Sequence, residues 1–227
     1  MLKKEVTAFE LNYKIHKFLR EHSTDYSEAE KDFILRNMDW GRKSCLVTDI
    51  LRQIYDELDL LADDKNIYLG FMKLIEDIFG ENRKIVEVGG GRIPRLGTRL
   101  ALANPKATIV VYEQNLLKTT TSLPNLKLKR ENFTVNSDIA GATLTCGFMP
   151  CEATLPQIQA SCEKGIDFIT ALCDGGNHQL LDTEEDDWEE HTIYEAKKLV
   201  KKHNLGDLKV TYMKEYQNPY PVIYNQR

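Results

Sequence analysis

The sequence predicts an α/β protein with a three-layer, mostly parallel sheet, an antiparallel C-terminal strand and an α-helical region before the sheet. Short β-branched runs alternate with helical patterns from residue 84 onward. Such alternation implies parallel strands with helices packed on the sheet. The last two runs, 208–213 and 221–224, are joined by a connection too short for a parallel crossover, so they should pair antiparallel. The first 80 residues show helical periodicity only.

Composition narrows the class of protein. The chain has 227 residues and a net charge of −5, which allows a large core and disfavours nucleic acid as a partner. No apolar run approaches the ~20 residues of a membrane span. Its five cysteines are odd in number and show no C-x-x-C spacing, so neither a disulfide framework nor a zinc site is expected. We therefore expect a cytoplasmic protein without a metal or a membrane segment.

Residues 1–80 are predicted to form a helical N-terminal region. Apolar spacing places helices at about 9–19, 45–61 and 66–79, with a short one beginning after Ser27 as its N-cap. Gly80 would end the last helix at its C′ position. These helices could pack on the following domain, cover a substrate pocket or form a homodimer.

Residues 81–227 are predicted to form the α/β domain. Helices are expected after the glycine turn, with Pro94 in the first turn of the helix, at about 155–164 and at about 187–203. Right-handed crossovers would bring the carboxyl ends of the parallel strands to one edge of the sheet. The predicted strands are 84–88, 107–112, 126–130, 142–146, 167–173, 208–213 and 221–224.

A glycine-rich turn follows the first predicted strand. Gly89, Gly90 and Gly91 stand between the strand and a predicted helix, with Glu87 two residues before the first glycine. Glycine lets the backbone approach a ligand closely, and the following helix start offers unpaired N–H groups. The fingerprint G-x-G-x-x-G of dinucleotide-binding folds is not completed, because Pro94 occupies its third glycine position.

The spacing Glu87-x-Gly89-x-Gly91 resembles motif I of the class I, Rossmann-like S-adenosylmethionine-dependent methyltransferases. The C-terminal hairpin is similar to the antiparallel last strand of that family's seven-stranded sheet. The resemblance covers about residues 82–227 and implies S-adenosylmethionine as cofactor and S-adenosylhomocysteine as product. It implies that Glu87 supports the turn and the ligand's amino-acid end. The family's third glycine falls at Ile93, which is a departure.

A second resemblance runs from the glycine turn through the fifth predicted strand. Over this stretch the chain is similar to a family of short, uncharacterised prokaryotic Rossmann-like proteins. That likeness implies no activity.

An acid ends the second predicted strand. Glu113 stands 24 residues beyond Gly89, near the spacing that a strand–helix–strand unit imposes, and could accept hydrogen bonds from both ribose hydroxyls of a nucleoside. Its charge would repel a 2′-phosphate, which disfavours NADP. Adenine is usually read after the third strand in the superfamily. The resemblance therefore implies that Asn132 bonds an adenine edge and that Phe133 stacks on the base.

The acceptor side of the site is expected after the fourth and fifth strands. Phe148 is placed with the cofactor-binding residues, and Asp174 is the predicted catalytic group, with Glu152 and His178 as weaker alternatives. Amino-group methyltransferases of the family often carry Asn/Asp-Pro-Pro-aromatic after the fourth strand. This chain keeps only Pro150 of that motif, which disfavours an enzyme of that type.

Three functions follow from these patterns. The first is an S-adenosylmethionine-dependent methyltransferase whose acceptor the sequence does not identify, with a small molecule favoured over a protein or RNA. The second is a non-catalytic nucleotide-binding or interaction module with the same fold. The third is an NAD-dependent oxidoreductase, against which Pro94 and the reversed last strand both count.

Overall fold

The computed structural model describes residues 7–37, 51, 54–55, 57–58, 60, 67–81, 83–173, 185–213 and 220–227. The chain divides into two compact units, Met1–Asn66 and Ile67–Arg227, which are described separately. The division differs from the expected boundary after residue 80. Helix α4 (Ile67–Phe79) belongs to the second unit, because its Phe71 ring packs against Phe148 of the sheet, 5.5 Å between centroids. Most of the expected helix at 45–61 lies outside the described residues.

The first unit contains helices α1 (Ala8–Glu21) and α2 (Glu28–Asn37). The predicted cap at Ser27 is confirmed. Ser27 Oγ accepts a hydrogen bond from the Glu30 N–H, and Glu30 Oε2 accepts one from the Ser27 N–H at 2.7 Å. This reciprocal arrangement satisfies two backbone donors that a helix start leaves open.

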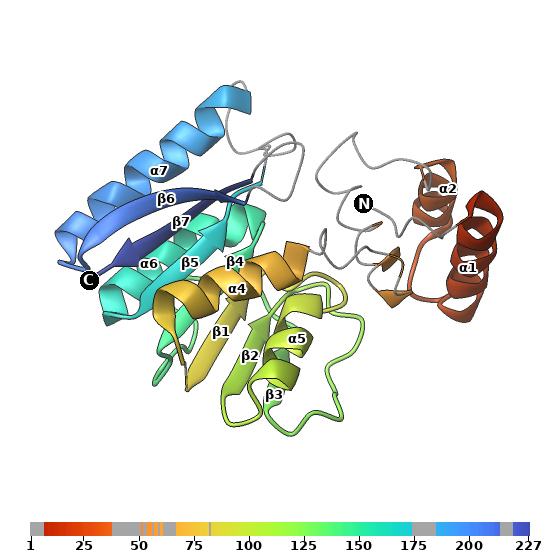
Figure 1. Cartoon of the computed structure of the whole chain (residues 1–227), viewed down its shortest axis with the longest axis horizontal. Helices are drawn as coiled ribbons and strands as arrows, with labels where there is room; N and C mark the ends of the chain where they lie inside the picture. Colours follow the sequence, from red (N-terminus) through yellow and green to blue (C-terminus); the bar gives the residue numbers. More distant parts are fainter. Residues whose placement is uncertain are drawn as a thin grey trace. The chain divides into compact units, whose positions relative to one another are not determined.

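The second unit is built on a seven-stranded sheet of order β3-β2-β1-β4-β5-β7-β6 (Figure 1). The five strands β1 to β5 run parallel, and β7 lies antiparallel between β5 and β6. This arrangement confirms the predicted mostly parallel sheet with its reversed C-terminal end. The strands are β1 (Lys84–Val88), β2 (Thr108–Tyr112), β3 (Leu126–Lys129), β4 (Leu144–Phe148), β5 (Asp167–Ala171), β6 (Asp207–Met213) and β7 (Tyr220–Gln226).

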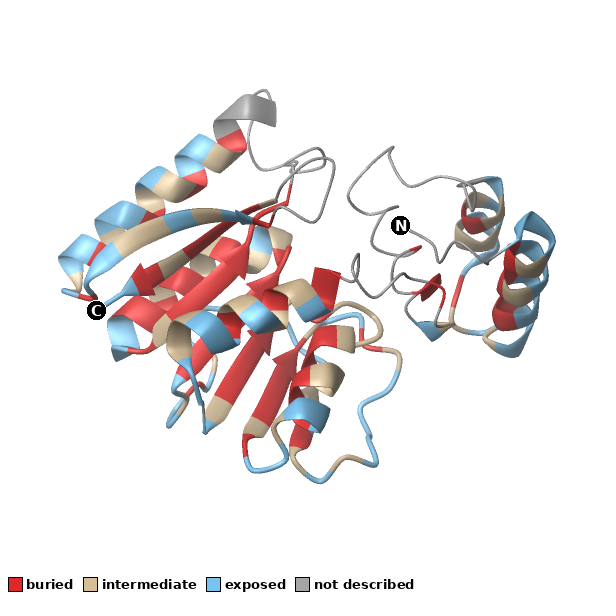
Figure 2. Cartoon of the chain, in the orientation of Figure 1, coloured by how far each residue is buried: buried red, intermediate tan, exposed pale blue. Residues whose placement is uncertain are grey.

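Helices cover both faces of this sheet, which makes the three expected layers. Helices α4 and α5 (Arg95–Ala103) pack together on one face, and α6 (Thr154–Lys164) and α7 (Glu185–Lys202) on the other. The strands between them carry the buried side chains (Figure 2). Within the described ranges, every helix is too short or too polar to span a membrane.

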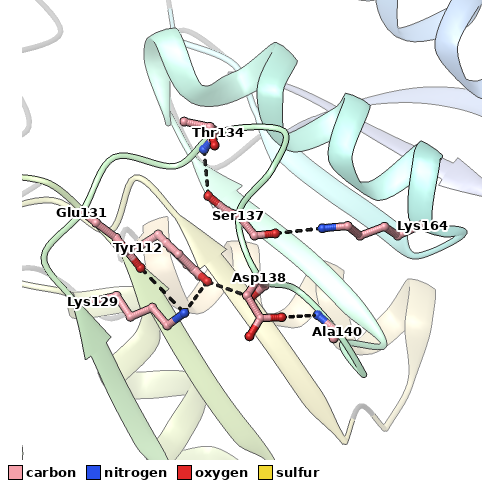
Figure 3. Close-up of polar contacts among 8 residues, drawn as sticks. All are labelled: Tyr112, Lys129, Glu131, Thr134, Ser137, Asp138, Ala140 and Lys164. Carbon is pink, nitrogen blue, oxygen red and sulfur yellow. Dashed lines mark hydrogen bonds and ion pairs between the residues drawn. The ribbon is translucent and has the colours of Figure 1, made fainter.

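The connection from β3 to β4, residues 130–143, contains no helix in the structure and instead lies as a loop against the sheet. Hydrogen bonds hold the loop against the sheet (Figure 3). The Tyr112 hydroxyl donates to the Asp138 carbonyl at 2.7 Å and accepts from Lys129 Nζ. Lys164 Nζ donates to the Ser137 carbonyl at 2.8 Å. The hydrogen bond from Lys129 Nζ to the Tyr112 hydroxyl is also the main reason that the pKa of Lys129 is raised.

Replacing Tyr112 by Phe removes the hydroxyl at the centre of this network. We expect a loss of about 1–2 kcal/mol in the free energy of unfolding, because the Asp138 carbonyl loses its donor while the ring still packs edge-on against Phe133. Urea unfolding of the variant beside the parent protein measures the loss. An unchanged unfolding midpoint would mean that the loop does not depend on this hydroxyl.

Candidate cofactor-binding site

The glycine turn, Glu113 and the segment after β4 lie together at the carboxyl ends of β1, β2 and β4. The Gly89 N–H, just after β1, donates to the Tyr112 carbonyl at the end of β2 at 2.9 Å. Glu113 follows immediately. Pro150, two residues after β4, packs over the start of the glycine turn. The same edge of the sheet therefore carries the turn, the acid and a proline cover.

The glycine turn needs its glycines for two different reasons. Gly89 and Gly91 have φ values of +69° and +72°, a region that side chains with a Cβ rarely adopt. A Cβ on Gly89 would also lie 2.8 Å from Pro150 Cα. Gly90 cannot be replaced by a larger residue either, because a Cβ there would overlap the Val111 side chain. The turn is thus fixed by its own backbone and by close packing.

Glu113 is held by backbone amides at the edge of the turn. Its Oε2 accepts from the Gly91 N–H at 3.2 Å, and its Oε1 accepts from the Asn115 N–H at 2.8 Å. The side chain is partly exposed. Each carboxylate oxygen has two lone pairs, so each can still accept one further hydrogen bond. A pair of neighbouring hydroxyls, as on a ribose, matches this arrangement.

The Glu87 carboxyl is buried between the glycine turn and α5, next to the backbone of Gly90 and Gly97. Only 2% of it is exposed, and its Oε2 makes no hydrogen bond. Burial raises its pKa to about 8, the nearby Gly97 N–H lowers it in part, and the charge of Glu113 raises it further. At neutral pH this carboxyl is mostly protonated. In this structure Glu87 supports the turn and the start of α5 from below.

Gly97 is a site residue that sequence reasoning missed. It lies in the first turn of α5, and a Cβ there would overlap Glu87 Oε2 and the Val111 side chain. The one available signal was a glycine inside a predicted helix, which costs about 1 kcal/mol relative to Ala and so suggests a packing requirement. Gly97 lets the helix approach β1 closely enough to enclose the Glu87 carboxyl.

The replacement Gly97→Ala should therefore destabilise the protein although alanine is the better helix former. We expect a net loss of about 1–3 kcal/mol, because the overlap with two buried side chains outweighs the gain in helix propensity. Thermal unfolding measures it. Gly141→Ala is not a suitable control, since Gly141 has φ +70°. Ser161→Ala and other changes at buried residues are also unsuitable as controls. Leu102→Ala is the control, because Leu102 lies on the exposed side of α5.

Phe148 lies in an aromatic cluster at the end of β4. Its ring centroid is 5.5 Å from those of Tyr68 and Phe71 on α4 and 6.4 Å from that of Tyr220 on β7. The cluster is buried apart from Tyr220, which is partly exposed. Phe148 is thus held in an aromatic cluster at the end of β4, and its role as a cofactor-binding residue stays a prediction.

The segment after β4 has a strained backbone. Met149 and Cys151, on either side of Pro150, have φ values of +54° and +52°. Such values cost on the order of 1–3 kcal/mol each for residues with a Cβ. Pro150, held between them, covers Gly89. Strain of this kind concentrates at functional sites. The acceptor side at this segment stays a prediction.

The remaining predicted residues differ in exposure, and two of them lie outside the described residues. Asn132 is exposed. Phe133 is 5% exposed, and its ring packs edge-on against Tyr112 in the core beneath the 130–143 loop. Adenine recognition by these two residues stays a prediction. Glu152 is exposed, and Asp174 and His178 lie outside the described residues. Within the described ranges no group of three His, Cys, Asp or Glu side chains could hold a metal ion.

No family model and no curated protein matches the sequence. Solved structures do match. A candidate O-methyltransferase from Nostoc punctiforme PCC 73102 is 12% identical with a TM-score of 0.50, over 71% of this chain and 56% of that one. Precorrin-6y C5,15-methyltransferase from Geobacter metallireducens GS-15 is 12% identical with a TM-score of 0.46, over 70% and 87%. PigF with SAH is 14% identical with a TM-score of 0.46, over 95% and 70%.

The strand order, the reversed β7 and the Nostoc match define the class: the α/β unit has the Rossmann-like fold of class I methyltransferases. This chain spans just over half of the Nostoc protein. At such low identity the likeness concerns the fold, and function has to be argued from the site.

Proposed function

We propose that the Ile67–Arg227 unit binds S-adenosylmethionine and transfers its methyl group to a small-molecule acceptor. The observation that carries this proposal is the Glu113 carboxylate, which backbone amides of Gly91 and Asn115 hold beside the glycine turn. Its open lone pairs suit the two ribose hydroxyls of an adenosyl group. The negative charge of this carboxylate would repel a 2′-phosphate, which disfavours NADP.

The residues at the end of β4 suit an apolar acceptor side. Phe148, Met149 and Pro150 are buried there, and none of them can transfer a proton. S-adenosylmethionine, when bound, supplies the electrophilic methyl group. An acceptor that is already nucleophilic needs alignment and exclusion of water more than acid–base catalysis. This chain's part would then be to bind, orient and enclose the reactants.

Names of structural neighbours agree with this proposal. The Nostoc protein is described as an O-methyltransferase, and it has the fold found here. Asp174 as the group that meets the acceptor, and a cytoplasmic location, remain part of the proposal. So does a role for the helices of Met1–Asn66 as a cap or interface.

Calorimetric titration of the full chain tests the cofactor. We expect micromolar binding of S-adenosylmethionine and S-adenosylhomocysteine and no binding of NAD. Transfer of labelled methyl groups to a small-molecule extract would then identify acceptors. Binding of neither adenosyl ligand would contradict the proposal and favour a non-catalytic interaction module. Binding of NAD alone would favour an oxidoreductase.

A further inference from the structure

Strand β6 forms one edge of the sheet, and its outer side is unpaired in the described structure. The sheet ends at β6, whose seven residues pair with β7 alone. No backbone hydrogen bond joins β6 to any other described segment. An open edge of this length can pair with another strand, and proteins usually protect such edges.

Apolar side chains stand on this open edge. Side chains alternate along a strand, so Leu208, Val210 and Tyr212 share one face. That face is the one covered by α7, because Leu208 packs against the cluster that α7 helps to form. Beyond Leu208 the cover is incomplete: Val210 is 38% exposed and Tyr212 is 47% exposed. An exposed apolar edge of this kind indicates an interface.

The order of residues in β6 is self-complementary. If two copies pair antiparallel about a two-fold axis at Val210, each Val210 lies opposite the other. Leu208 of each copy then lies opposite Tyr212 of the second copy, on the same face. All three exposed or half-exposed apolar side chains are thereby covered. A shift by one residue would place them on opposite faces.

The charges of α7 favour the same arrangement. Its sequence begins with carboxylates and ends with lysines. Lys197 and Lys201 line an open cavity of about 620 Å³ beside Leu208 of β6, and neither has a carboxylate partner within the described ranges. Glu190 is exposed and, seven residues before Lys197, lies on the same stripe of the helix.

A two-fold axis at Val210 turns the second α7 antiparallel to the first. The acidic start of each helix then approaches the lysine-rich end of the other. The helix dipole alone accounts for charges separated in this way along one helix. The helix dipole does not account for an apolar, unpaired strand edge beside the lysines. The inference rests on finding the charge pattern of α7 and the open β6 edge side by side.

We propose that a second copy of this chain docks on the β6 edge. The two β6 strands pair antiparallel, the sheet continues through both subunits, and the two α7 helices lie side by side on one face. This surface is distinct from the N-terminal helices. The inference does not depend on the proposed methyl transfer.

Sedimentation velocity of the full chain over a wide concentration range tests whether two copies associate through β6. The parent chain should be a dimer. Val210→Lys places two ammonium groups opposite each other at the axis and should weaken association about 100-fold. Val210→Thr, which keeps a β-branched side chain of similar size, should remain mostly dimeric. Circular dichroism and the thermal midpoint show whether each variant is folded.

Exchanging charges on α7 tests whether the two α7 helices lie antiparallel and side by side. Lys201→Glu and Glu190→Lys should each weaken the dimer, and the double variant should recover it, because opposite charges again face each other. A parent chain that is monomeric at every concentration would overturn the proposal. So would a dimer that Val210→Lys leaves intact, particularly one that dissociates when Phe9 and Tyr13 of α1, which are 83% and 58% exposed, are changed to Ser.

Discussion

Replacing Glu113 by Ala should weaken binding of S-adenosylhomocysteine by about 100-fold. Two hydrogen bonds from ribose hydroxyls to a carboxylate would be lost, each worth about 1.5–3 kcal/mol, and part of that loss would be offset by water. The Gly91 and Asn115 amides would lose their acceptor as well. Calorimetry measures the change in affinity.

Two further variants make this result specific. Glu113→Gln keeps one acceptor oxygen but turns an amide group towards a backbone N–H, so an intermediate loss is expected. Glu131→Ala removes an exposed carboxylate from the segment after β3, where it lies 3.7 Å from Lys129 Nζ. It should bind normally. Equal binding by the parent and Glu113→Ala would show that this carboxylate does not hold the ribose.

Glu87 should make the stability of the protein fall as the pH rises from about 4.5 to about 8. Its pKa is raised from 4.5 to about 8 by burial, so the folded state keeps a proton that the unfolded state releases over this range. Stability falls with pH wherever the folded state binds more protons. At about 1.4 kcal/mol per pKa unit the loss amounts to several kcal/mol.

Glu87→Gln removes this dependence. The variant should match the parent near pH 5 and exceed its stability by several kcal/mol near pH 9, because the amide has no proton to release on unfolding. Urea unfolding at both values measures the difference. Glu152→Gln changes an exposed carboxyl and should leave the parent's profile unaltered. Parallel profiles for Glu87→Gln and the parent would mean that Glu87 is ionised in the fold at neutral pH.

Local patterns were sufficient to predict the elements of the α/β unit. The apolar run at Lys84–Val88 forms β1 as predicted, and the helix before Gly80 ends there, with Gly80 at φ +62°. The short connection before β7 implied an antiparallel pair because no crossover fits into so few residues. These features depend on neighbours in sequence, so the sequence shows them directly.

The meeting of Glu113 with the glycine turn was also predictable, because parallel strands joined by one helix end side by side at a known spacing. The boundary before α4 was not. A helical pattern shows which face is apolar but not what covers it, and only the fold shows Phe71 packed against Phe148.

The sequence by itself determined the fold class, the antiparallel C-terminal strand and the position of the glycine turn. Hydrophobic periodicity, the glycine run and the length of each connection set these features, and all three can be seen in short stretches of sequence. The tertiary structure alone decided what each side chain faces. It turned Glu87 into the space beside Gly97, placed Pro150 over Gly89 and used the Phe133 ring in the core. Burial and pKa depend on atoms contributed by distant segments, and no local pattern contains that information.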